Sequence, residues 1–168
     1  MFRVVTLFLA ASLAGCVADR PHGSRGPAAG PSAVEAQRLR AEVLKELDRY
    51  YRDFSARNWE AFATHFWPGA TITTIWAPPG EEQRRVVVSS VEDFIASAGE
   101  GPDSKAIFEE RMGRAEVRAE GVLALVWAQY HARMGDPRQV SEWSGVDAFT
   151  LMKHEGLWKI TSLAFAPE

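Results

Sequence analysis

The sequence has few of the residues that build covalent or metal-held structure. It contains one cysteine among 168 residues, Cys16, so no disulfide can form within the chain. Its Cys and His residues show no metal-ligand spacing, and it contains neither a glycine-rich phosphate loop nor a nucleophile elbow. Nothing in the sequence therefore indicates a metal or a cofactor, and we expect none.

Clustered positive charge is also missing. The 19 Lys and Arg residues are interspersed with 22 Asp and Glu residues, and the formal net charge is −3. Binding to a nucleic-acid backbone requires a concentration of basic side chains. We therefore expect no nucleic-acid partner.

The N-terminal apolar run, which begins at Val4, is too short to span a bilayer as a helix. It ends in the string Leu13-Ala14-Gly15-Cys16. A basic residue, an apolar run and small residues in this order are typical of a cleavable export signal. The string resembles a bacterial lipoprotein signal, which implies that residues 1–15 are removed and that Cys16 is lipidated. An ordinary secretory signal and a short buried segment of a cytosolic fold are the alternatives.

The segment after the cysteine differs in composition from the rest of the chain. Residues 16–31 are rich in Pro, Gly, Ala, Ser and Arg and are expected to form a flexible tether. By resemblance to lipoprotein sorting rules, Val17 in place of an aspartate favours the outer membrane, with the protein facing the periplasm. Residues 32–168 are long enough for one domain with a single core.

Three helices are expected in the first half of this domain. A capping box at Ser32 and apolar residues at helical spacing predict a long helix that ends near Arg57. Asn58 is the expected cap of a second helix, from Trp59 to about Phe66. Ser90 is the expected cap of a third, residues 91–98.

Strands follow a different pattern. Residues 70–76 and 85–89 are rich in β-branched side chains and predict a hairpin. Four longer segments, joined by short turns, predict an antiparallel meander: 106–119, 122–134, 140–154 and 157–165. Helices followed by a meander indicate an α+β fold.

Two short motifs carry a family resemblance: residues 58–62 (NWEAF) and residues 155–160 (EGLWKI). They are similar to the helix turn and the closing hairpin of the NTF2-like superfamily, which includes the SnoaL-like and DUF4440-type domains. The resemblance implies a cone in which a strongly bent antiparallel sheet wraps around three N-terminal helices. Enzymes with this fold use Asp, His, Tyr or Arg side chains that project into the cone.

Asp147 is the strongest catalytic candidate. A two-residue turn over Pro137-Arg138 would place it opposite Ala128 and on the face of Tyr130 and Trp143. A carboxylate among aromatic side chains is desolvated and can serve as a general base. The alternative is a structural aspartate paired with an arginine.

The remaining candidates have plain structural alternatives. Tyr130 and His131 are the proposed hydrogen-bonding partners of Asp147, although alternation places His131 on the opposite face. Trp143, Trp76 and Tyr51 are candidate ligand-binding residues, and the simpler alternative for each is a core aromatic. His65 and His154 are expected to face solvent.

Two functions remain open at this point. The preferred one is a lipid-anchored envelope protein that binds a small apolar ligand or a protein partner without catalysis. The alternative is a cofactor-independent isomerase, dehydratase or hydrolase with Asp147 as general base. Many related domains carry a pocket histidine near Ala164, and its absence here counts against catalysis. Leu123, Leu125 and Trp127 share one strand face and are a candidate surface for homodimer formation.

Overall fold

The computed structural model describes residues 32–76 and 83–168. The predicted signal peptide, Cys16 and the tether lie outside the described residues, as does the side chain of Trp76. The described chain forms helices packed against one six-stranded sheet. None of these helices is long and apolar enough to cross a membrane.

Each of the three predicted helices begins at its predicted cap. The helices are α1 (Ala33–Ser55), α2 (Trp59–Thr64) and α3 (Val91–Ala96). Ser32, Asn58 and Ser90 each accept a hydrogen bond from the backbone N–H three residues further on, at 3.2, 3.2 and 3.0 Å. These bonds satisfy donors that a helix N-terminus would otherwise leave free.

Two helices are shorter than the sequence predicts. The backbone N–H of Ile160 donates to the carbonyl of His65 at 2.9 Å, and this bond draws the chain into a strand directly after α2. α3 gives way to two short 3₁₀ turns, η1 (Ala98–Glu100) and η2 (Pro102–Ser104).

The sheet has the order β2-β1-β6-β5-β4-β3. Its strands are β1 (Phe66–Trp76), β2 (Arg85–Ser90), β3 (Ile107–Glu120), β4 (Leu123–Asp136), β5 (Gln139–His154) and β6 (Leu157–Pro167). The predicted hairpin and meander are confirmed as antiparallel pairs. The predicted bent sheet is antiparallel except between β1 and β6, which pair in parallel, so the sheet is mixed.

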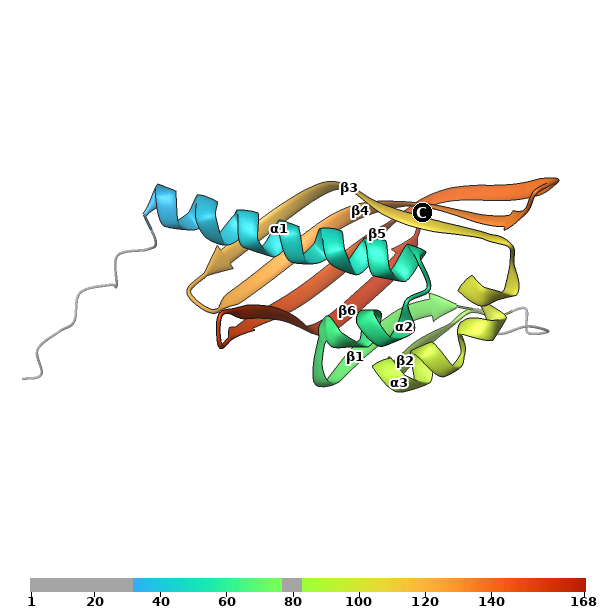
Figure 1. Ribbon diagram of the computed structural model, residues 1–168, viewed down its shortest axis with the longest axis horizontal. Helices are drawn as coiled ribbons and strands as arrows, with labels where there is room; N and C mark the ends of the chain where they lie inside the picture. Colours follow the sequence, from blue (N-terminus) through green and yellow to red (C-terminus); the bar gives the residue numbers. More distant parts are fainter. Residues whose placement is uncertain (1–31, 77–82) are drawn as a thin grey trace, which may run out of the picture.

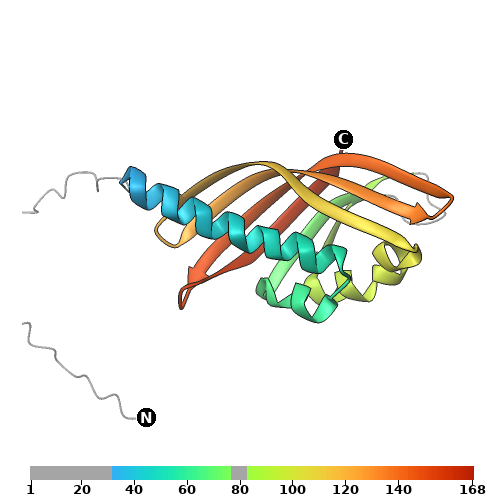
Figure 2. The same ribbon diagram turned by 45° about the horizontal axis from the view of Figure 1, so that its top comes forward.

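The sheet is strongly bent, and α1 lies across its concave side with α2 and α3 beyond the end of α1 (Figures 1 and 2). Register shifts interrupt three of the strand pairs. They lie between Met112 and Ala115 in the β3–β4 pair, after Thr150 in the β5–β6 pair, and after Phe66 in the β1–β6 pair. An extra residue in one strand bends it and increases its twist. The sheet therefore curls around the helices without closing into a barrel.

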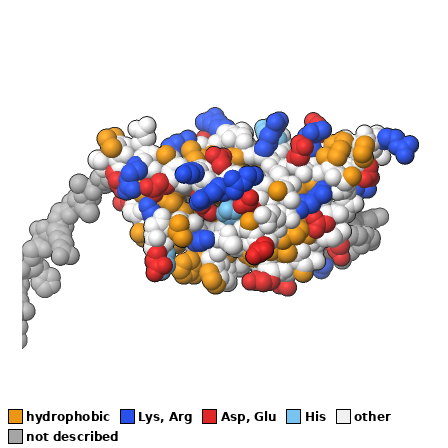
Figure 3. All heavy atoms as spheres, viewed as in Figure 1, with side chains coloured by type: hydrophobic (Ala, Val, Ile, Leu, Met, Phe, Trp, Pro, Cys, Tyr) orange, Lys and Arg blue, Asp and Glu red, His pale blue; other side chains and the backbone are white. Residues whose placement is uncertain are grey.

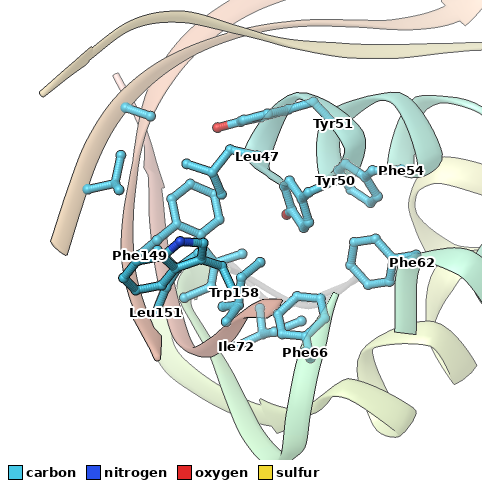
Figure 4. Close-up of a cluster of buried hydrophobic side chains, with 14 of the residues drawn as sticks. Leu47, Tyr50, Tyr51, Phe54, Phe62, Phe66, Ile72, Phe149, Leu151 and Trp158 are labelled. Atoms are coloured by element: carbon cyan, nitrogen blue, oxygen red, sulfur yellow. The ribbon is translucent and has the colours of Figure 1, made fainter. Parts of the chain in front are cut away.

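The concave side of the sheet and the helices share an aromatic core (Figure 4). Phe54 of α1 and Phe62 of α2 lie 5.2 Å apart between ring centroids, and Tyr50 lies 5.4 Å from Phe149 of β5. Alternation along β4 is as predicted, with Ala124 to Ala132 buried at every second position. The face that carries α1 shows acidic and basic side chains side by side (Figure 3).

Candidate active site

The carboxyl group of Asp147 lies inside the cone. Asp147 is 2% exposed, and its neighbours on the same face of β5 are Gly145 and Phe149. The predicted two-residue turn is confirmed, since Asp136 pairs with Gln139, and it places Asp147 opposite Ala128. On its other side, Asp147 pairs with Phe165 of β6. Small and aromatic neighbours therefore surround a polar group in the centre of the sheet.

Tyr51 supplies the hydrogen bond that this carboxyl receives. Its hydroxyl donates to Oδ2 of Asp147 from across the core. The residue is positioned by the buried stripe of α1, where Leu47, Tyr50, Tyr51 and Phe54 face the sheet (Figure 4). The sequence predicts Tyr51 as a ligand-binding residue and Tyr130 or His131 as the partner of Asp147. In the structure, Tyr51 makes this hydrogen bond.

A second carboxyl group, that of Glu110, faces the same interior. Glu110 lies on β3 opposite Ala132, a buried residue of the apolar face of β4. Its backbone is held by Ser55 at the end of α1, whose hydroxyl accepts from the Glu110 N–H at 2.8 Å and donates to its carbonyl at 2.6 Å. Burial, together with the nearby charge of Asp147, raises the pKa of Glu110 well above its usual range.

Glu110 is not among the residues predicted from the sequence, because charged residues occur at both odd and even positions of β3. Alternation alone did not identify the inward face, since the register shift after Met112 changes the pairing of β3 with β4. Without this shift Glu110 would lie opposite Arg133 on the outer face, so no local signal in the sequence indicated that it faces inward.

Tyr130 lies on the same inner surface and is 3% exposed. It pairs with Gly145, and a Cβ at that position would collide with the Tyr130 hydroxyl and with the carbonyl of Ala166. The glycine therefore leaves the space that the phenol occupies. Burial, followed by the charges of Glu110 and Asp147, raises the pKa of Tyr130 to about 12, so it is a neutral hydrogen-bond donor at physiological pH.

The pKa of Asp147 is raised to about 7. Burial disfavours the charged carboxylate and outweighs the hydrogen bond from Tyr51, which lowers the pKa. The sequence left open an arginine partner for Asp147. In the structure its hydrogen-bond partner is the phenol of Tyr51. A carboxyl with this pKa exchanges protons near neutral pH, as a general base or acid must.

The other predicted site residues lie elsewhere. His131 is exposed on the outer face of β4, where its Nδ1 is 2.8 Å from the Ser144 Oγ, so it cannot reach Asp147. Trp143 faces inward and is half-buried at the edge of the core. Trp76 ends β1, and its side chain lies outside the described part of the chain.

His65 is buried, so the expectation that it faces solvent is wrong. It is 5% exposed, with Nδ1 2.7 Å from a Glu46 oxygen and Nε2 2.9 Å from an Asp53 oxygen. Burial opposes the charge of Glu46, but hydrogen bonds from His65 and Arg49 lower its pKa overall. Both ring nitrogens are occupied by carboxylates, which makes this cluster a structural link between α1 and the start of β1.

Metal ligation is not indicated within residues 32–76 and 83–168, where no group of His, Cys, Asp and Glu side chains is arranged to hold an ion. The polar side chains around Asp147 are the Glu110 carboxyl and the phenols of Tyr50, Tyr51 and Tyr130.

No family model matches the sequence. Among solved structures, an NTF2-like family protein from Streptomyces avermitilis, a candidate dehydratase, has a TM-score of 0.64 at 12% identity, over 79% of this chain and 98% of that one. A candidate scytalone dehydratase from Novosphingobium aromaticivorans DSM 12444 has a TM-score of 0.62 at 14% identity, over 77% and 83%. An NTF2-like superfamily protein from Salmonella enterica has a TM-score of 0.61 at 12% identity, over 78% and 92%. The chain has the NTF2-like fold, as its sequence motifs predicted.

One sequence relative is Pea pathogenicity protein 2 of Fusarium vanettenii, which is 36% identical over 95 residues. The match covers 54% of this chain and 36% of the relative. Most of the relative therefore has no counterpart here, and its role does not carry over.

Replacing Asp147 by Asn should stabilise the fold at neutral and higher pH. A folded pKa near 7 against the usual 3.8 means that the folded state holds a proton that the unfolded state releases, so the carboxyl costs stability as pH rises from about 4 to 8. Relative to wild type, Asp147→Asn should gain up to about 4 kcal/mol at pH 8 and little at pH 4.

Urea unfolding at the two pH values measures this difference. Asp48→Asn, the same change at an exposed position of α1, should alter stability little at either pH. An Asp147→Asn variant that loses stability at pH 8 would show that the carboxylate is a favourable structural group.

Proposed function

We propose that this protein is a cofactor-independent acid–base enzyme in which Asp147 transfers a proton to or from a small molecule bound inside the cone. The observation that carries the proposal is a buried carboxyl group with a pKa near 7, held by a phenol and accompanied by a second carboxyl group. This proposal takes the alternative function considered from the sequence, an enzyme with Asp147 as general base, in preference to binding without catalysis.

The neighbouring groups have complementary roles. Tyr51 orients the Asp147 carboxyl, because its hydroxyl holds one oxygen and leaves the other available. Tyr130 can donate a hydrogen bond to an oxygen on which charge develops, as phenols do in proton-abstraction sites. Glu110 can take or return a second proton. Two carboxyls and neutral phenols support isomerisation, in which a base removes a proton from one carbon and an acid returns a proton to another. They also support dehydration, in which the acid protonates a hydroxyl group that leaves as water.

The side chains around Asp147 also limit the substrate class. They are aromatic and aliphatic, and the polar groups among them are carboxyls and phenols. Such a surface favours a small, uncharged and largely apolar molecule with a hydroxyl or carbonyl group. Two of the solved structures with this fold are candidate dehydratases, which agrees with this class.

The base function can be tested without knowledge of the natural substrate. 5-Nitrobenzisoxazole opens when a base removes the proton at C3: the N–O bond breaks and the electron pair ends on the phenolate oxygen of 2-cyano-4-nitrophenolate. Full-length protein should catalyse this reaction, with kcat/KM rising through a midpoint near pH 7. Asp147→Asn should lower the rate by about 10²–10⁴-fold, the usual contribution of a general base.

Asp48→Asn again serves as the control and should keep the rate. An equal rate in wild type and Asp147→Asn would contradict the proposal. Saturable binding of the probe without any turnover would favour the alternative, a binding domain without catalysis.

We further propose that the protein is lipid-anchored through Cys16 at the cell envelope, at the outer membrane on the periplasmic side. The support is the resemblance of residues 1–16 to a lipoprotein signal that ends in a cysteine, together with the Pro-, Gly-, Ala- and Ser-rich composition of residues 16–31. Several acyl chains on one cysteine anchor a protein stably, whereas one chain does not.

Expression of the full-length protein in a Gram-negative host tests this anchor. The protein should be found in the membrane fraction, and intact-mass analysis should show a chain that begins at a lipid-modified Cys16. Cys16→Ser should leave the precursor unlipidated. Recovery of an unmodified wild-type chain would contradict lipidation.

A homodimer is proposed on the outer face of the sheet. Leu123, Leu125 and Trp127 are 45%, 48% and 58% exposed on β4, and they form an apolar surface on the side away from α1. Sedimentation velocity should show a dimer that Trp127→Glu dissociates. Val34→Glu, the same kind of change at an exposed apolar residue of α1, should leave the dimer intact. A monomeric wild type would contradict this assembly.

A further inference from the structure

The outer face of the sheet carries a groove that the proposed reaction does not use. It has a volume of about 450 Å³ and is lined by β3, β4 and β5. Its lining residues are Glu109, Arg111, His131, Ala132, Arg133, Glu142, Trp143 and Ser144. This volume is in the range of small-molecule sites.

The register of the three strands arranges the polar side chains in two rows across the groove. In the first row, Glu109, Arg133 and Glu142 lie opposite one another. Arg133 is bonded to both carboxylates, at 3.0 Å to Glu109 and 2.9 Å to Glu142. This row is internally paired and carries excess negative charge.

The second row is not paired in this way. Arg111, His131 and Ser144 lie opposite one another. The Nδ1 of His131 is 2.8 Å from the Ser144 hydroxyl. Within the described chain, no hydrogen bond or ion pair is made by the guanidinium of Arg111, and none by the Nε2 of His131.

Gly113 leaves room for the imidazole ring of His131. It lies in the β3 bulge, and a Cβ there would stand 3.2 Å from the Nε2 of His131. Arg111 and His131 face each other directly across the strand pair, where side chains lie about 5 Å apart at Cβ. The guanidinium of Arg111 is a donor, and the Nε2 of His131 donates in the tautomer whose Nδ1 accepts from the Ser144 hydroxyl. Two such donors side by side and without an acceptor suit an anion.

We infer that this groove binds a small organic anion, whose carboxylate or phosphate group is held between Arg111 and His131. The guanidinium presents paired N–H groups that match the oxygens of either anion. Glu109 and Glu142 at the neighbouring row disfavour a second negative group there, so the ligand carries its charge at one end. This site is separate from Asp147, which lies on the opposite face of the sheet.

Titration of full-length ¹⁵N-labelled protein with benzoate and, separately, with inorganic phosphate tests the site. We expect saturable shifts at Arg111, His131 and Ser144, and the comparison of the two probes identifies which anion is preferred. Arg111→Gln should weaken binding by about tenfold or more, because it removes a charge-assisted hydrogen bond.

Arg114→Gln is the matched control. It removes the same charge from the same strand, but Arg114 is paired with Glu116 at 3.1 Å and does not line the groove. Its affinity should stay within about twofold of wild type, since distant exposed charges are screened by salt. Equal losses in the two variants would overturn the site in favour of general charge attraction, and the absence of saturable binding by both probes would also overturn it.

Asp147→Asn separates this inference from the proposed enzyme function. The variant should bind the anion as wild type does, even though it loses proton transfer. Loss of anion binding in Asp147→Asn would place the anion inside the cone and would overturn the outer groove.

Discussion

The hydrogen bond from the Tyr51 hydroxyl to the Asp147 carboxyl positions the candidate active site, and the proposed chemistry depends on it. It joins α1 to the middle of β5 across an aromatic core, so the helix, the curvature of the sheet and the environment of the carboxyl depend on one another. The bend of the sheet brings β3 and β5 toward the same helix, which places Glu110 and Asp147 on one inner surface. A flat sheet would leave these groups exposed to water, with ordinary pKa values.

Burial of two carboxyl groups with raised pKa values opposes folding, because the unfolded chain ionises them freely. The carboxylates beside His65 are stabilised in a different way, because the buried imidazole lies between them and contacts both. Asp147 and Glu110 have phenols and apolar walls as neighbours. This difference distinguishes a structural charge cluster from a surface suited to proton exchange, and it is the physical basis of the proposed chemistry.

Local signals in the sequence predicted most of the fold. The helix caps at Ser32, Asn58 and Ser90, and the tight turn that sets the register of Asp147, act within a few residues and could be read directly. The parallel pairing of β1 with β6 joins distant segments and has no local signature. The inward position of Glu110 and the burial of His65 also have no local signature in the sequence. Each depends on side chains that are distant in the chain.

The central claim concerns the proton affinity of one carboxyl group, and a ¹³C NMR titration of the Asp147 side chain measures it most directly. The structure predicts a midpoint near pH 7, with a smaller linked response from the Glu110 carboxyl that Asp147 influences. A midpoint near the ordinary value of 3.8 would contradict the account. It would show that the carboxyl is solvated or neutralised and that the interior of the cone is not built for proton transfer.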